Sequence, residues 1–139
     1  MKTVVLISCT KSKRTYPCEA VLLYDVSSKF KKSLTYAKII STDIYIISTK
    51  HGLLSLDTVV EPYNETLIGK PKEEKQKWGS MVVTQIKEFF DIESTRFIIL
   101  AGKDYYEPLL PHLYCKIPLC GATMFNWDTK MKILMTTCE

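Results

Sequence analysis

The sequence lacks most of the short motifs that identify an enzyme class. It has no GxGxxG dinucleotide fingerprint and no GxSxG nucleophile elbow. Gly102-Lys103 cannot end a nucleotide P-loop, because Phe97 occupies the place of the upstream glycine. Cys9 and Arg14 are one residue too close for the Cys-x5-Arg phosphate cradle of cysteine phosphatases. The standard motif spacings of these four classes are therefore excluded.

Nothing in the sequence indicates a metal site, a cofactor or a disulfide framework. The chain has 2 histidines and 5 cysteines without a CxxC pair. His51 and His112 have no cysteine or carboxylate partner at metal-ligand spacing, so we expect neither a metal nor a cofactor. An odd number of cysteines in a chain that needs no cross-links predicts a reduced, cytoplasmic setting. The apolar run Val4 to Ile7 is too short for a signal peptide or a membrane span, so no membrane contact is expected.

Short apolar strands alternate with amphipathic segments along the chain. With 46% apolar and 24% charged residues, the composition is that of a globular protein. Runs at 3–8, 44–47 and 96–101 predict strands buried on both faces, hence a parallel sheet. Helices are expected at 27–40, 72–90, from Gly102 to Pro111 and at 127–135, with a last short strand at 116–119. The order predicts a single α/β domain over residues 1–139, with three layers and a mostly parallel sheet of four or slightly more strands, flanked by helices.

Loops beginning at Cys9, Thr49 and Gly102 leave the carboxyl ends of predicted strands and should meet at one rim. The first 50 residues contain nine Lys and Arg against three acids, a charge of +6 that leaves the remainder at −2. A positive N-terminal third suits a nucleotide or nucleic acid as partner. The lysines at 29, 31, 32 and 38 are explained equally well as the solvated face of a helix.

The long polar segment from Thr49 to Leu67 is the first place to look for catalytic groups, because such loops are uncommon without a function. Glu61 precedes a proline that stiffens the backbone, and its carboxylate could activate water or stabilise a cation-like transition state. Asp57 and Glu65 compete for this role. The alternative for Glu61 is an ion pair with Lys50 or Lys11.

Other residues of the rim are candidates for binding a substrate. Lys11, Lys13 and Lys50 could hold phosphate as point charges. Gly52 and Gly102 follow strands, where backbone can approach a ligand, although both could be turn residues only.

Aromatic side chains and one thiol complete the candidates. Tyr63, Tyr105 and Tyr106 could stack on a base, or could simply pack against the protein. Cys9 near lysines would form a thiolate easily, and His51 could reach it from the neighbouring loop. A small buried residue at the end of a strand is the alternative for Cys9.

Five ordered motifs carry a resemblance to a known family. They are Ile7-Ser8-Cys9-Thr10-Lys11-Ser12-Lys13, Leu23-Tyr24 with Ser28-x-Phe30, Ser48-x-Lys50-x-Gly52-Leu53-Leu54, Glu61-Pro62-Tyr63-Asn64-x-Thr66-Leu67 and Leu100-Ala101-Gly102-x-x-Tyr105. Up to about Gly121 the chain resembles an uncharacterised bacterial and phage domain family akin to the YaaA-type peroxide-stress proteins. Members of that family occur beside transglycosylase-like domains associated with deazaguanine modification of DNA.

The resemblance implies an α/β fold and chemistry on nucleobases or nucleic acids. Three further candidates for substrate contacts lie within these motifs: Ser8, Asn64 and Thr66. Residues 122–127 depart from the family's Gly-rich turn and Trp-bearing helix, which leaves a contribution of the C-terminal segment to the site open.

Three functional hypotheses follow from these residues. The first is an enzyme that acts on an N-glycosidic bond, with Glu61 or Asp57 as the catalytic carboxylate. The second is a non-catalytic nucleic-acid-binding module that uses the basic first third. The third is an accessory subunit of a larger modification enzyme. The oligomeric state is open.

Overall fold

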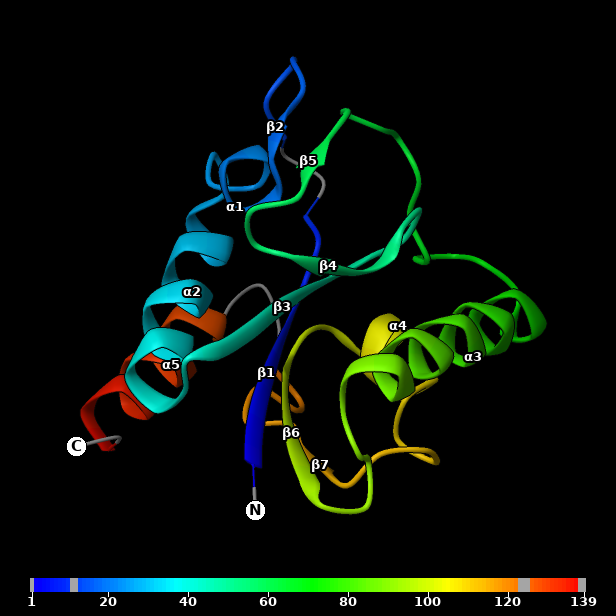
Figure 1. Cartoon of the computed structure of the whole chain (residues 1–139). Helices are drawn as coiled ribbons and strands as arrows, with labels where there is room; N and C mark the ends of the chain where they lie inside the picture. Colours follow the sequence, from blue (N-terminus) through cyan, green and yellow to red (C-terminus); the bar gives the residue numbers. More distant parts are fainter. Residues whose placement is uncertain (1, 11–12, 123–125, 138–139) are drawn as a thin grey trace.

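The computed structural model describes residues 2–10, 13–122 and 126–137. Its strands are β1 (Lys2–Ser8), β2 (Cys18–Glu19), β3 (Asp43–Ser48), β4 (Gly52–Ser55), β5 (Val59–Val60), β6 (Thr95–Leu100) and β7 (Cys115–Lys116). Five of them form one sheet in the order β4-β3-β1-β6-β7, and β2 pairs with β5 in a second, two-stranded sheet (Figure 1). The main sheet is parallel except at β4, which confirms the predicted mostly parallel sheet.

Strand β1 is the centre of the sheet and of the core. It pairs in parallel with β3 on one side and with β6 on the other. Residues Val4 to Ile7 are at most 1% exposed, since both faces of the strand are covered. A continuous run of β-branched and apolar residues suits such a position, where no face meets water.

The helices are α1 (Ala20–Leu23), α2 (Ser28–Ile40), α3 (Lys72–Phe89), α4 (Lys103–Tyr106) and α5 (Trp127–Thr137). The short helix α1 contacts the small sheet of β2 and β5, and α2, α3, α4 and α5 lie on the two sides of the main sheet (Figure 1). Figure 1 shows α2 and α5 together on one side of the sheet, and α3 with α4 on the other. The prediction of three layers is therefore confirmed.

Helix α3 continues through Gly79, which weakens a helix when it is exposed. Here the helix passes close to Pro108, and a Cβ at position 79 would lie 2.7 Å from the Cβ of Pro108. The glycine therefore allows α3 to pack against the turn that follows α4.

One predicted loop and two predicted boundaries were wrong. The segment after Thr49 is less irregular than expected, because it contains β4 and β5. The helix after Gly102 ends at Tyr106, since Pro108 has no N–H to continue it. The last strand is Cys115–Lys116 instead of residues 116–119. None of the helices in the described ranges is long and apolar enough to cross a bilayer.

Candidate functional site

Two adjoining cavities open at the carboxyl ends of β1 and β6. The larger, about 420 Å³, is called the α2 cavity because the first turns of α2 form one of its walls. The smaller, about 290 Å³, is called the Lys13 cavity. Both are lined by Cys9, Thr10, Ile68 and Tyr105.

The position of the cavities follows from the topology of the sheet. The chain leaves β1 towards β3 and leaves β6 towards β7, on opposite sides of the gap between β1 and β6. The ends of both strands line the α2 cavity, with Ile7 and Ser8 from β1 and Leu100 from β6. Open α/β sheets bind their ligands at such a divergence of connections.

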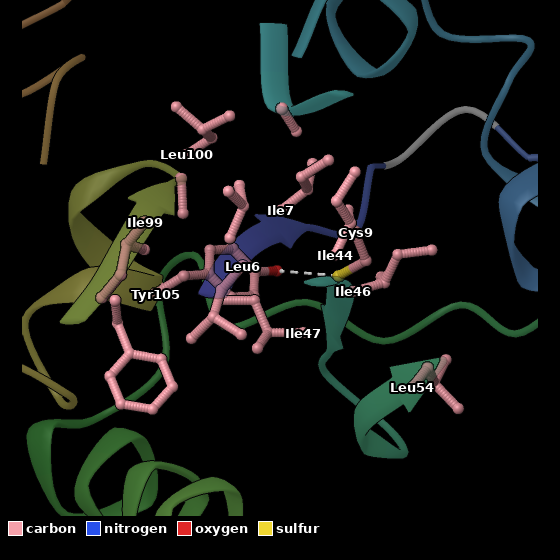
Figure 2. Packing of buried hydrophobic residues seen from close by; sticks show 14 of the residues in the cluster. Leu6, Ile7, Cys9, Ile44, Ile46, Ile47, Leu54, Ile99, Leu100 and Tyr105 are labelled. Atoms are coloured by element: carbon pink, nitrogen blue, oxygen red, sulfur yellow. Dashed lines mark hydrogen bonds between the residues drawn. The ribbon is translucent and has the colours of Figure 1, made fainter. Parts of the chain in front are cut away.

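The thiol of Cys9 lies at the boundary between the core and the cavities. It donates a long hydrogen bond to the Tyr105 hydroxyl, at 3.8 Å (Figure 2). The Thr49 hydroxyl lies 3.4 Å from the Cys9 sulfur and 2.9 Å from the Tyr105 oxygen. Burial raises the pKa of Tyr105, so this phenol keeps its proton at neutral pH. Cys9 is 8% exposed, which agrees with the expectation of a small buried residue at a strand end.

A second group of hydroxyls joins β3 to two distant segments. The Ser48 hydroxyl donates to the Tyr63 hydroxyl at 2.7 Å, and the Tyr63 and Tyr24 oxygens lie 2.5 Å apart. Burial raises the pKa of both phenols, that of Tyr24 to about 12. From α3, the Trp78 indole donates to the Ser48 carbonyl at 2.9 Å. The network fixes the loop after β5 against β3.

The cation Lys13 extends from the loop after β1 into the smaller cavity. Its Nζ lies 4.6 Å from the centre of the Tyr63 ring, a cation–π geometry. Burial lowers the pKa of Lys13, and the nearby Cys9 opposes this shift. The amine is thus partly desolvated, where its interaction with an anion is stronger than in open water.

The structure brings about half of the predicted site residues to the cavities. Those that line at least one cavity are Ser8, Cys9, Lys13, Asn64, Thr66, Gly102 and Tyr105. Those that line neither are Lys50, His51, Gly52, Asp57, Glu61 and Tyr63. Lys11 lies outside the described residues.

The predicted residues away from the cavities have other surroundings. Asp57 accepts a hydrogen bond from Ser55 at 2.9 Å, and Glu61 is exposed. Within the described part of the chain, Glu61 has no ion-pair partner, so the expected alternative pair with Lys50 is not formed. His51 packs edge-on against Tyr63, with ring centres 5.6 Å apart.

Several residues at the cavities were not predicted as substrate contacts. Ser27, Lys29 and Ser33 of the α2 region line the larger cavity, and Glu65 lines the smaller one. Glu65 was considered only as a competitor of Glu61. Ser27 precedes α2, and its side chain accepts a hydrogen bond from the Phe30 amide at 3.3 Å. The described residues contain no cluster of three or more His, Cys, Asp or Glu that could hold a metal ion.

Comparison with known proteins shows the family of this chain. No curated protein and no solved structure matches it significantly. Residues 4–134 match a family of unknown function, DUF6884, over almost the full length of the chain. The chain therefore belongs to the DUF6884 family.

Proposed function

We propose that this protein is an enzyme that acts on the N-glycosidic bond of a nucleoside, a nucleotide or a base in a nucleic acid. The observation that carries the proposal is the lining of the Lys13 cavity. It brings together a cation, a carboxylate, an amide and a phenol, from Lys13, Glu65, Asn64 and Tyr105. These groups come from three segments that meet only in the folded chain.

The dimensions and the chemistry of the cavities support a nucleobase compound as ligand. Volumes of about 290 and 420 Å³ are near the lower end of the range for small-molecule sites, roughly 300–1,000 Å³. The Asn64 amide can both donate to and accept from a base edge. The sequence motifs also resemble an uncharacterised family whose members occur beside domains associated with deazaguanine modification of DNA, which favours the same class of ligand.

Glu65 is the carboxylate to which we assign the reaction. Of the three carboxylates considered, it alone lines one of the two cavities, whereas Asp57 and Glu61 line neither. In hydrolysis, the bond between the sugar C1′ and the base nitrogen breaks and a water oxygen bonds to C1′. Glu65 would take the proton of that water, while the departing nitrogen gains a proton from solvent. General base catalysis of this kind commonly contributes about 10²–10⁴ in rate.

Base release is the direct test of this proposal. Purified protein is incubated with nucleosides, nucleotides and modified DNAs, and free base is measured by chromatography. We expect release from at least one substrate and a loss of about 10²–10⁴ in rate in Glu65→Gln. Glu61→Gln is the matched control, since it changes an exposed carboxylate on the same segment away from the cavities.

Two results would count against the proposal. The first is that no substrate releases a base. The second is that Glu65→Gln retains full activity. If Glu61→Gln is inactive and Glu65→Gln is active, the catalytic carboxylate is Glu61 and the assignment to the cavity is wrong.

The alternative is a binding module that uses the basic first third. Lys2 and Arg14 pair with Asp43 and Asp25, which the charge of +6 already includes, so only the pairing of Lys32 with Asp128 at 2.6 Å offsets more of it. A binding module, alone or as an accessory subunit of a modification enzyme, predicts DNA or RNA affinity that falls steeply with salt. It also predicts that binding survives Glu65→Gln.

A further inference from the structure

We infer that the substrate carries a terminal phosphate group and that this phosphate binds in the α2 cavity, against the first turn of α2 and the hydroxyl of Ser33. The inference deepens the proposed function, on which the identity of the rest of the ligand depends. It narrows the substrate class to nucleoside monophosphates or to nucleic acids with a terminal phosphate.

The first observation is the free beginning of α2. Ser27 caps the helix by accepting a hydrogen bond from the Phe30 amide at 3.3 Å. The amides of Ser28 and Lys29 have no acceptor among the described residues. The first turn contains no acidic side chain. Free amides and the helix dipole together make such an end attractive to an anion.

The second observation is independent of the helix end. Ser33 lines the same cavity and is only 4% exposed, yet its hydroxyl makes no hydrogen bond to any described residue. In the described part of the chain, every side-chain oxygen or nitrogen that is completely enclosed has a hydrogen-bond partner. The Ser33 hydroxyl has none, so it is not completely enclosed and is accessible from the cavity that Ser33 lines. A hydroxyl that faces the cavity without a partner in the described protein can form a hydrogen bond with a ligand oxygen that enters there.

The charges around the α2 cavity also favour an anion. Lys29, one helical turn before Ser33, lines the cavity and lies 5.7 Å from the ring centre of Trp127. The carboxylate of Asp104 lines it as well, but Lys75 donates to this carboxylate at 2.5 Å. The negative charge of Asp104 is therefore offset within the protein. Lys29 forms no direct ion pair in the described residues, although the carboxylate of Asp128, which pairs with Lys32 at 2.6 Å, also interacts with it electrostatically.

The position of the phosphate relative to the base follows from the shared wall of the two cavities. Cys9, Thr10, Ile68 and Tyr105 line both, so one ligand can occupy both spaces. A base beside the Lys13 cavity would then place its phosphate at α2. Because Ser33 is almost fully buried, the group that reaches it must enter a recess. A terminal phosphate can enter such a recess because it is bonded to the rest of the ligand on one side only. An internal phosphodiester is bonded on both sides, so the nucleic-acid chain would have to enter the recess and leave it again.

The experiment compares matched ligands with and without the phosphate. Inorganic phosphate, nucleosides and their 5′-monophosphates are titrated into the full chain by calorimetry, and backbone amides are followed by NMR. Hydrogen bonds to a charged group predict that monophosphates bind on the order of tenfold more tightly than nucleosides, or better. Inorganic phosphate should shift the amide signals of Ser28, Lys29 and Ser33.

Variants of α2 test whether these residues hold the phosphate. Ser33→Ala and Lys29→Met should each reduce the preference for monophosphates to within about threefold. Lys31→Met and Thr35→Ala are matched controls on exposed positions of the same helix that do not line the cavity, and both should retain the preference. Equal preference in all five proteins would overturn the inference.

The outcomes separate this inference from the proposed function. If nucleosides and monophosphates bind equally, the phosphate site is wrong, although the nucleobase site stands. If no base-containing ligand binds and no base is released, but phosphate binding depends on Ser33, the inference stands and the proposed function fails. Absence of binding by every phosphate-bearing probe overturns the inference.

Discussion

Replacing Gly52 with alanine should destabilise the protein strongly, because two separate effects combine at this turn. Gly52 has a φ of +71°, where a side chain costs about 1–2 kcal/mol. Its added Cβ would also collide with Oε1 of Gln85. That oxygen accepts from the Leu53 backbone amide at 2.8 Å, and Nε2 of Gln85 donates to the His51 carbonyl at 3.1 Å. Losing these bonds costs about 0.5–1.5 kcal/mol each, so the total is about 2–5 kcal/mol.

Gly69 provides the control for the backbone term. Its φ is +80°, but a Cβ there would have no neighbour within 4 Å. Gly69→Ala should therefore cost only about 1–2 kcal/mol. Urea unfolding with linear extrapolation gives the free energy of unfolding of both variants. Gln85→Ala and the double variant Gly52→Ala/Gln85→Ala complete a double-mutant cycle, in which the collision with the Gln85 side chain is absent. Equal losses in Gly52→Ala and Gly69→Ala would refute the reasoning.

Two further predictions concern the buried hydroxyl network. Because burial raises the pKa of Tyr24 to about 12, its contribution to stability should be complete below pH 10 and should fall as the pH rises through 12, by about 2–3 kcal/mol in total. Urea unfolding at pH 9 and pH 11 should show that the free energy of unfolding falls less between these pH values in Tyr24→Phe than in the wild-type protein. An identical fall in the two proteins would contradict the raised pKa of Tyr24. Trp78→Phe removes the hydrogen bond to the Ser48 carbonyl and should lower the free energy of unfolding by about 1–3 kcal/mol, whereas an unchanged value would show that this bond contributes nothing.

The main strands and long helices could be predicted because their signals are local. β1, β3 and β6 are continuous apolar runs, and α2 and α3 repeat apolar residues at helical spacing. β4 and β5 have only short, mixed sequences. They exist because β4 pairs with β3, and because β5 pairs with Cys18–Glu19, a segment far from it in the sequence. Pairing of that kind cannot be seen in either segment alone.

The site was predictable at the level of strand ends but not at the level of side chains. The rule for parallel sheets predicted that Cys9 and Gly102 would meet, and both line the α2 cavity. Glu61 and Glu65 lie on the same segment, and only the course of that loop determines which of them reaches a cavity. The proposed role of Ser33 could not be predicted from the sequence, because nothing in the sequence distinguishes a helical serine with an unpartnered hydroxyl from any other.

The most direct test of the account is a crystal structure of this protein soaked with a nucleoside monophosphate. The account predicts density for the base and sugar against Lys13, Glu65 and Tyr105, with the phosphate at the beginning of α2. A ligand bound on another surface, with both cavities filled only by solvent at saturating concentration, would contradict it.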